Sequence, residues 1–206
     1  MGMKLLLASA SPRRRELLAG LDLPMETVRL QDVDETCPSH LRGGAIALHI
    51  ARLKMSAYAL PLAPDEVLVT ADTVVWVADD ATLTGAAADE APGAVFGKPR
   101  DAADARRMLR ALSGRVHQVY TGVCLRSAGG ETSFVSRTDV HFARLTDAQI
   151  DYYIERYAPF DKAGAYGIQE WIGYVGVERL EGSYFNVMGL PVQRLHTELR
   201  RLSGDA

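Results

Sequence analysis

The stretch from Val67 to Val77 consists almost entirely of apolar and β-branched residues. Such a run is typical of a central strand that is buried on both faces of a sheet. Asp72 and Thr73 interrupt the run, and a carboxylate inside a buried strand costs free energy unless it is paired, hydrogen-bonded or bound to a cation. We therefore interpret Asp72 as a candidate functional acid. The alternative is a strand end or bulge that satisfies the carboxylate locally.

Strand-like and helix-like patterns alternate along the whole chain, which predicts an α/β protein. Lys4–Ala8 is predicted to be a strand, followed by a helix that Ser11 caps and Pro12 begins. A long amphipathic helix over 46–57 places Lys54 beside its apolar stripe. The other predicted elements are a strand at 25–30, a helix capped by Asp101, a hairpin over 117–142, a helix capped by Thr146 and Gln149, a strand pair near 172–187 and a closing helix at 195–202.

The chain is expected to be a single domain of two lobes over residues 1–206. No linker or repeat divides it, and domains commonly contain roughly 100–200 residues. The segment 79–95 is rich in Ala, Gly, Thr and Asp and shows neither a helical nor a strand period. We predict that this segment is a long flexible hairpin tip or insertion.

Composition and charge exclude several classes of protein. With 48% apolar and 24% charged residues, the chain is neither collagen-like, disordered nor a coiled coil. No apolar run approaches the roughly 18 residues of a membrane span, and 1–7 is too short for a signal-peptide core, so we expect a cytoplasmic protein with no membrane partner. A net charge of −3 provides no basic field for a nucleic acid, so phosphate binding has to come from local clusters.

The helix predicted after Ser11 carries three consecutive cations in its first turn, Arg13, Arg14 and Arg15. The N-terminal end of a helix is already positive, so each of these side chains costs about 0.3–1 kcal/mol unless an anion binds there. Exposed N–H groups, the hydroxyls of Ser9 and Ser11 and forked guanidinium groups together match the oxygens of a triphosphate. The alternative is a solvated basic turn.

Two acids in a polar loop, Asp34 and Glu35, are ordinary on their own, since acidic loops are usually solvated. If they face Asp72, however, the carboxylates can hold Mg²⁺, which binds a few carboxylates together with substrate phosphates and water. No HExxH, Walker A, GxGxxG or GxSxG motif is present, and the two cysteines lack the spacing of a zinc or redox site.

Three further side chains are candidates for substrate contacts. Lys98 and Lys162 can each place a point charge on phosphate oxygens, although isolated lysines are more often surface groups. The amide of Gln169 offers a donor and an acceptor, which the N–H and C=O edge of uracil or thymine requires. Spacing alone does not decide between these roles and surface positions.

Taken together, the motifs resemble the Maf family of nucleoside triphosphate pyrophosphatases. The matching segments, in chain order, are Ala8–Arg14, Ala71–Thr73, Gly97–Asp101, Leu112–Gly114, His117–Val123, Asp161–Gln169, Gly182–Tyr184 and Gly189–Pro191. They cover nearly the whole chain, and their common order is far more specific than any one of them.

The resemblance implies a two-lobed mixed α/β fold similar to inosine triphosphate pyrophosphatases, with a nucleotide in a central cleft. It also implies metal-dependent cleavage between the α and β phosphates, with Mg²⁺ or Mn²⁺, giving a nucleoside monophosphate and pyrophosphate. By motif, Asp72 is the proton acceptor that activates water, and Glu35 and Asp72 are the metal ligands. Arg13, Thr73 and Gln169 match positions associated with substrate choice. The other substrate-binding positions are Ser9, Arg14, Lys54, Lys98 and Lys162.

The segment Asp161–Gln169 resembles the subfamily that acts on dTTP and UTP rather than the branch that acts on 7-methyl-GTP. Two features depart from the family pattern. The segment 79–95 is longer than the usual turn before Gly97, and Asp34 precedes Glu35, which leaves open which acid faces the metal. Two other functions are alternatives: a nucleotide-binding regulator of cell division with little turnover, and a nucleic-acid binder that uses 13–15. A homodimer is also left open.

Overall fold

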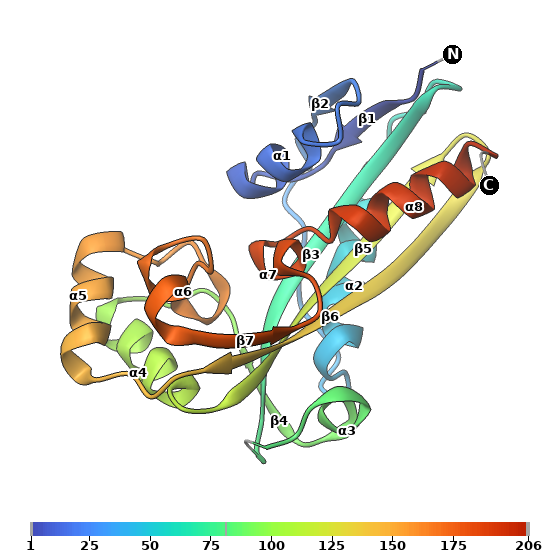
Figure 1. Ribbon diagram of the computed structural model, residues 1–206. Helices are drawn as coiled ribbons and strands as arrows, with labels where there is room; N and C mark the ends of the chain where they lie inside the picture. Colours follow the sequence, from blue (N-terminus) through green and yellow to red (C-terminus); the bar gives the residue numbers. More distant parts are fainter. Residues whose placement is uncertain (1, 81, 205–206) are drawn as a thin grey trace. The chain divides into compact units, whose positions relative to one another are not determined.

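The computed structural model describes residues 2–80 and 82–204, and it forms a mixed α/β protein as predicted (Figure 1). The strands are β1 (Lys4–Leu7), β2 (Met25–Thr27), β3 (Glu66–Ala78), β4 (Gly93–Phe96), β5 (Val116–Ser127), β6 (Gly130–Phe142) and β7 (Val177–Glu181). The helices are α1 (Pro12–Ala19), α2 (Gly43–Ser56), α3 (Gly85–Glu90), α4 (Ala102–Leu112), α5 (Asp147–Tyr157), α6 (Trp171–Gly176), α7 (Tyr184–Met188) and α8 (Val192–Leu202), with a short 3₁₀ turn, η1, at Ala163–Ala165.

Within the described residues, the strands form one mixed sheet in the order β2-β1-β3-β5-β6-β7, and β4 pairs with β3 at the side. β1 is parallel to both β2 and β3, while β4 is antiparallel to β3. The apolar run from Val67 to Val77 is therefore a central strand, as its composition predicts. Among the same residues, every helix falls short of the length and apolarity that crossing a membrane requires.

The chain divides into two compact units. Unit 1 contains the described residues of Met1–Thr73, Thr121–Ser136 and Gly189–Ala206, and unit 2 contains Val74–Tyr120 and Arg137–Met188, of which Ala81 lies outside the described residues. The long strands β3, β5 and β6 contribute residues to both units.

In unit 1, α2 packs directly on the sheet through a small apolar cluster that includes Ala51, Met55 and Leu68. The approach is closest at Gly122 of β5, where a Cβ atom would lie 2.4 Å from the backbone nitrogen of Leu48. Only glycine fits this position without moving the helix backbone. The contact therefore fixes the helix that carries Lys54.

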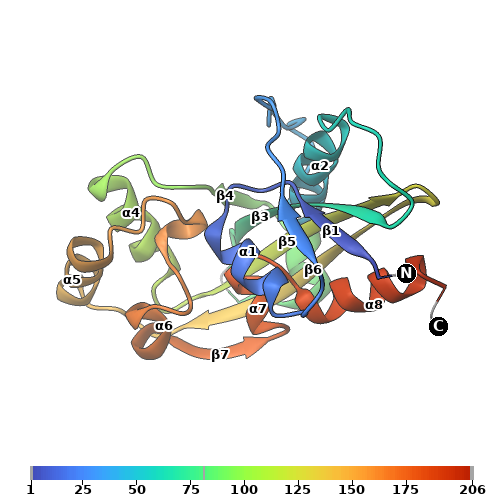
Figure 2. The same ribbon diagram turned by 90° about the horizontal axis from the view of Figure 1, so that it is seen from above.

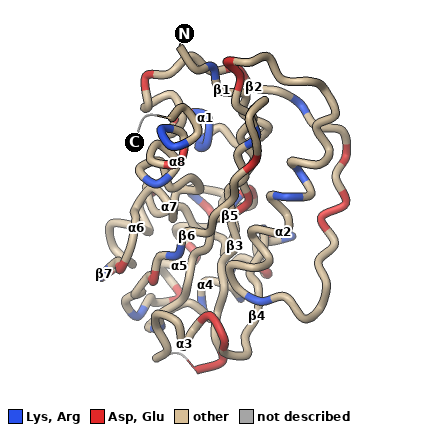
Figure 3. Tube along the Cα trace, turned by 90° about the vertical axis from the view of Figure 1, so that its right-hand side faces the viewer, with Lys and Arg blue, Asp and Glu red and all other residues tan. Residues whose placement is uncertain are grey.

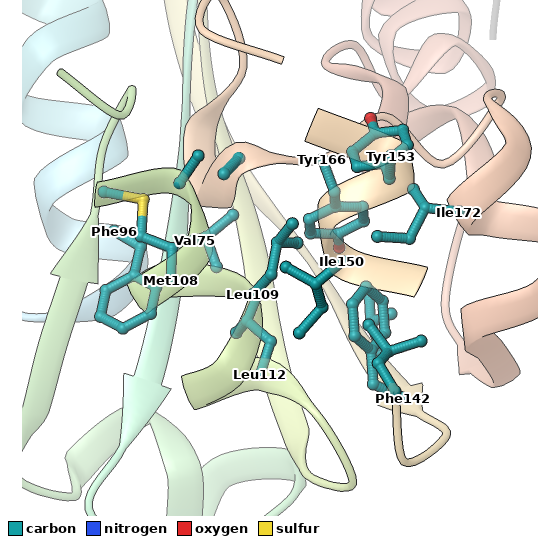
Figure 4. Close-up of a cluster of buried hydrophobic side chains, with 14 of the residues drawn as sticks. Val75, Phe96, Met108, Leu109, Leu112, Phe142, Ile150, Tyr153, Tyr166 and Ile172 are labelled. Atoms are coloured by element: carbon teal, nitrogen blue, oxygen red, sulfur yellow. The ribbon is translucent and has the colours of Figure 1, made fainter. Parts of the chain in front are cut away.

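Unit 2 has its own apolar core, built around α4 and α5, which lie side by side (Figure 2), and the neighbouring strands. Figure 4 shows Leu109 and Leu112 from α4 with Ile150 and Tyr153 from α5, packed near Tyr166 and Phe142. The rings of Phe142 and Tyr166 meet edge to face, with centroids 4.9 Å apart. This core supports the segment 161–170, which carries Lys162 and Gln169.

Local sequence signals predicted several boundaries correctly. Ser11 accepts a hydrogen bond from the Arg14 N–H at the start of α1, and Asp101 accepts one from the Asp104 N–H at the start of α4. The capping box of Thr146 and Gln149 is complete in both directions at the start of α5.

The segment 79–95, predicted to be a flexible hairpin tip or insertion, follows β3 and, outside Ala81, contains α3 and most of β4, which pairs antiparallel with β3. Its flexibility stays a prediction. Backbone pairing to β3, from Val75↔Phe96 to Ala78↔Gly93, forms a strand that the side-chain pattern does not show. The region 172–187 was predicted to be a strand pair, but it forms α6, β7 and α7. Apolar runs this short do not distinguish a helix from a strand, and only β7 has a partner, β6.

Candidate active site

The central acid, Asp72, lies on β3 in unit 1 with its side chain 15% exposed. Its Oδ1 accepts a hydrogen bond from Lys54 Nζ at 2.7 Å. The same ammonium group lies 3.0 Å from Oε1 of Glu35. Lys54 of α2 thus brings the two acids together, and the carboxylate on the central strand is satisfied by an ion pair.

The structure distinguishes Glu35 from its neighbour Asp34. The Asp34 carboxylate accepts hydrogen bonds from the backbone N–H and the hydroxyl of Thr36, and these bonds lower its pKa. Asp34 therefore stabilises its own loop. Glu35 is the acid of this pair that reaches Lys54, the partner of Asp72.

Arg14 of α1 is buried, and its guanidinium donates to neutral groups. Nε donates to the Gly189 carbonyl at 2.8 Å, and one terminal nitrogen donates to the Ala71 carbonyl at 2.8 Å. The other terminal nitrogen donates to the Thr73 hydroxyl at 2.9 Å. Burial lowers the pKa of Arg14, and the negative charge of Asp72 opposes this effect. Arg14 therefore connects the start of α1 to the residues on both sides of Asp72.

The remaining predicted residues of unit 1 surround this arginine. The Ser9 hydroxyl accepts from the Ser11 N–H at 3.2 Å and from Arg14 at 3.5 Å. Arg13 lies two residues after the capping residue Ser11. Its charge repels that of Arg14 and lowers the pKa of Arg14, so the two cations contribute positive potential to the same place. Figure 3 shows the basic residues of α1 as a continuous blue stretch. The Thr73 hydroxyl also lies 2.9 Å from the Thr121 hydroxyl, and its role in substrate choice stays a prediction.

Unit 2 holds the other three predicted residues. Lys162 is buried, with Nζ 2.8 Å from Oδ1 of Asp161 and 3.0 Å from Oε1 of Glu170. Gln169 has a buried Oε1 atom that accepts no hydrogen bond from residues 2–80 or 82–204. Lys98 is exposed, and its loop is tied to that of Lys162 by a bond from the Gly164 N–H to the Gly97 carbonyl, 3.0 Å long. That these side chains contact substrate stays a prediction.

The two acids that could hold a divalent cation are Glu35 and Asp72 of unit 1. Both contact the ammonium group of Lys54, so one oxygen of each lies close to a common point that this ammonium occupies. No group of three or more His, Cys, Asp or Glu side chains with metal-binding geometry occurs in the described part of the chain. Mg²⁺ often takes only one or two carboxylates and completes its shell with phosphate oxygens and water. That Glu35 and Asp72 hold such a cation stays a prediction.

Sequence reasoning missed two residues of unit 2 next to Lys162 and Gln169, namely Glu170 and Tyr153. The Tyr153 hydroxyl donates to Oε2 of Glu170 and accepts from the Gly167 N–H at 3.0 Å. Tyr153 was assigned only to the apolar face of its helix. A tyrosine on a buried face usually finds a hydrogen-bond partner for its hydroxyl, which is the signal that could have pointed to this contact.

Comparison with known proteins places these motifs in a family. Residues 4–202 match the family described as Maf-like protein. Among curated proteins, one from Phocaeicola vulgatus named dTTP/UTP pyrophosphatase is 52% identical over 97% of this chain and 96% of its own length. Proteins with the same name from Bacteroides fragilis, 50% identical over 97% and 96%, and Flavobacterium psychrophilum, 42% identical over 95% and 93%, are also similar.

Among solved structures, a HAM1 protein from Coxiella burnetii is similar over 69% of this chain and 74% of its own, with 17% identity and a TM-score of 0.39. The sequence matches extend over almost the whole chain and include every motif that suggested the resemblance. The chain belongs to the Maf family.

Proposed function

We propose that this protein hydrolyses dTTP and UTP to the nucleoside monophosphate and pyrophosphate. The observation that carries the proposal is the Asp72–Lys54–Glu35 cluster, which lies in unit 1 near the buried cation Arg14. Relatives up to 52% identical over nearly the full length carry the name dTTP/UTP pyrophosphatase, which supports the same substrates here.

Asp72 is the group that takes a proton from the attacking water. Lys54 holds Oδ1 at 2.7 Å, which fixes the carboxylate and leaves Oδ2 to accept the proton. The water oxygen forms a bond to the α phosphorus, the bond from this phosphorus to the bridging oxygen breaks, and pyrophosphate leaves with the electron pair. Arg13, Arg14 and Lys54 contribute positive charge that offsets the charge of the phosphates.

Glu35 and Asp72 would hold a divalent cation, Mg²⁺ or Mn²⁺, and when bound this cation would stabilise negative charge on phosphate oxygens as a Lewis acid. The chain's own contribution is the paired carboxylates, which Lys54 keeps close together.

Gln169 is the group that reads the base. Its buried Oε1, which accepts no hydrogen bond within the described residues, can accept from the N3–H of uracil or thymine, and its amide nitrogen can donate to a ring carbonyl. Cytosine has an acceptor at N3, so it would leave Oε1 unpaired. A site built to hydrogen-bond one base rejects analogues that leave its polar groups without partners, which favours UTP and dTTP over CTP.

The test is pyrophosphate release from UTP, dTTP and CTP in the presence of Mg²⁺. The native protein is expected to prefer UTP and dTTP, and Asp72→Asn is expected to lower kcat by about a thousand-fold, because an amide cannot take the proton. Asp32→Asn, which changes an exposed acid, is the matched control and should retain full activity. Equal activity, or equal inactivity, of the native protein and Asp72→Asn would refute the assignment of the base.

A further inference from the structure

Gln169 lies in a tight turn of unit 2. The turn runs from Gly167 to Glu170, and the Glu170 N–H closes it by donating to the Gly167 carbonyl at 3.0 Å. Ile168 and Gln169 are its two central residues, and the backbone of a β-turn sets the direction of the side chains at these positions. Whatever holds the ends of this turn therefore sets where the Gln169 amide lies.

One hydroxyl group bonds both ends of the turn. Tyr153 of α5 is fully buried, and its hydroxyl accepts from the Gly167 N–H at 3.0 Å while it donates to Oε2 of Glu170. Burial and the neighbouring Glu170 raise the pKa of Tyr153, so the hydroxyl keeps its proton and remains a donor at neutral pH. The ring is packed in the core of unit 2 beside Ile172 (Figure 4), which gives the hydroxyl a fixed position.

The same turn also positions Lys162. The second oxygen of Glu170, Oε1, lies 3.0 Å from Lys162 Nζ. Gly167 lies beneath this ion pair, where a Cβ atom would be 2.9 Å from Lys162 Cε and 3.0 Å from Glu170 Cδ. A larger residue at 167 would push the pair apart, so the glycine, the carboxylate and the lysine form one closely packed unit.

From these contacts we propose that Tyr153 is a positioning residue for nucleotide selectivity: its hydroxyl fixes the Gly167–Glu170 turn, and through it the amide of Gln169 and the ammonium of Lys162. The proposal rests on the proposed function in one respect, the assignment of Gln169 to the pyrimidine base. It adds a residue that contacts no substrate and acts only through the turn.

The test compares Tyr153→Phe with Tyr157→Phe. Both remove one phenol hydroxyl from α5, and the two rings are stacked with centroids 5.2 Å apart, but Tyr157 bonds neither end of the turn. The readout is the affinity ratio for α,β-imido analogues of UTP and CTP, which cannot be hydrolysed, measured by calorimetry on the full chain. Tyr153→Phe is expected to reduce this ratio about ten-fold, the size of a lost buried hydrogen bond, and Tyr157→Phe should leave it unchanged.

Two further variants keep the result decisive. Gln169→Ala gives the ratio expected when the amide is absent, and Glu170→Ala removes the other partner of the Tyr153 hydroxyl and should reduce the ratio as Tyr153→Phe does. If Tyr153→Phe does not fold, Glu170→Ala is compared with Glu170→Gln, which also removes the counter-charge of Lys162 but keeps an acceptor for the Tyr153 hydroxyl, and a lower ratio in Glu170→Ala than in Glu170→Gln supports the proposal. A native ratio in the folded variants, or an equal loss of affinity for both analogues, would overturn the proposal. Turnover of UTP by the native protein is a separate readout, and its absence would count against the proposed function alone.

Discussion

Each unit of the molecule contains one buried cation that the family resemblance assigns to substrate binding. The two cations differ in the charge of the groups that accept their hydrogen bonds. Arg14 in unit 1 is 9% exposed, and Lys162 in unit 2 is 8% exposed. The acceptors around Arg14 are neutral: two backbone carbonyls and hydroxyl oxygens. Lys162 instead lies between two carboxylates, those of Asp161 and Glu170.

The difference determines what each cation can do. Neutral acceptors satisfy the N–H groups of Arg14 without cancelling its charge, so the guanidinium remains a source of positive potential near Asp72. Carboxylates cancel the charge of Lys162, and its net effect on an anion is small while both pairs persist. The charge of Arg14 is thus left uncompensated by its hydrogen-bond partners, whereas the charge of Lys162 is compensated within unit 2.

The largest effect is expected at Arg14. Arg14→Met would leave the carbonyls of Ala71 and Gly189 without their donor, and we expect the free energy of unfolding to fall by about 4 kcal/mol. Arg14→Lys restores the charge but not the planar fork, so it should recover less than half of this loss. Urea unfolding at neutral pH measures both values.

Arg15→Met is the control for Arg14, because it removes an exposed arginine from the same helix and should change stability by less than about 0.5 kcal/mol. If Arg14→Lys were as stable as the native protein, the charge of Arg14 rather than its fork of donors would be what matters. The contrast with Lys162, a simple ammonium, would then disappear.

A smaller effect is expected at Lys162. Lys162→Met leaves Glu170 without its counter-charge, and we expect a loss of about 2 kcal/mol in the free energy of unfolding. Glu170→Gln in the same chain removes the orphaned charge while its amide oxygen can still accept from Tyr153, so the double variant should recover most of the loss. The coupling is measured by urea unfolding of the four proteins of the cycle. Additive losses would show that the ion pair contributes nothing and that Lys162 stabilises the unit only by packing.

The sequence predicted the types of residue in the site better than their partners. Asp72 was identified because a carboxylate interrupted an apolar strand. Lys54 was only placed beside the apolar stripe of a helix, and its role came from the family resemblance. Neither pattern shows that Lys54 reaches both Asp72 and Glu35, since this depends on how α2 packs on the sheet at Gly122. The carbonyl of Gly189 is 175 residues away from Arg14, and no local pattern connects positions that far apart.

The fold shows the same division between local and distant information. The caps at Ser11, Asp101 and Thr146 were correct because each is a contact within three or four residues. α3 and β4 were not predicted, because β4 is held by backbone pairing to β3, to which its own side-chain pattern gives no clue. The strand pair predicted near 172–187 was wrong because apolar runs this short do not distinguish a helix from a strand, and the pairing of β7 with β6 connects residues about 40 positions apart.

The smallest effect concerns a third way to bury a basic group, which is to give up its proton. Burial lowers the pKa of His117 from 6.5 to about 3, and its Nε2 pairs with the Tyr166 hydroxyl at 2.8 Å. Between these values the unfolded chain binds a proton that the folded chain does not. Above pH 6.5 this histidine is neutral in both states and does not lower the free energy of unfolding. As the pH is lowered from 6.5 toward 3, the free energy of unfolding falls.

Urea unfolding should show a loss of about 1 kcal/mol from this group between pH 7 and pH 5.5, which is the range in which His117 of the unfolded chain becomes protonated. His117→Phe keeps a ring against Phe142 and Tyr166 but cannot titrate, so it should flatten the pH dependence even if it lowers stability overall. His196→Ala removes an exposed histidine and should leave the slope unchanged. An unaltered slope in His117→Phe would mean that this histidine is charged in the folded protein, and unit 2 would then bury two cations rather than one.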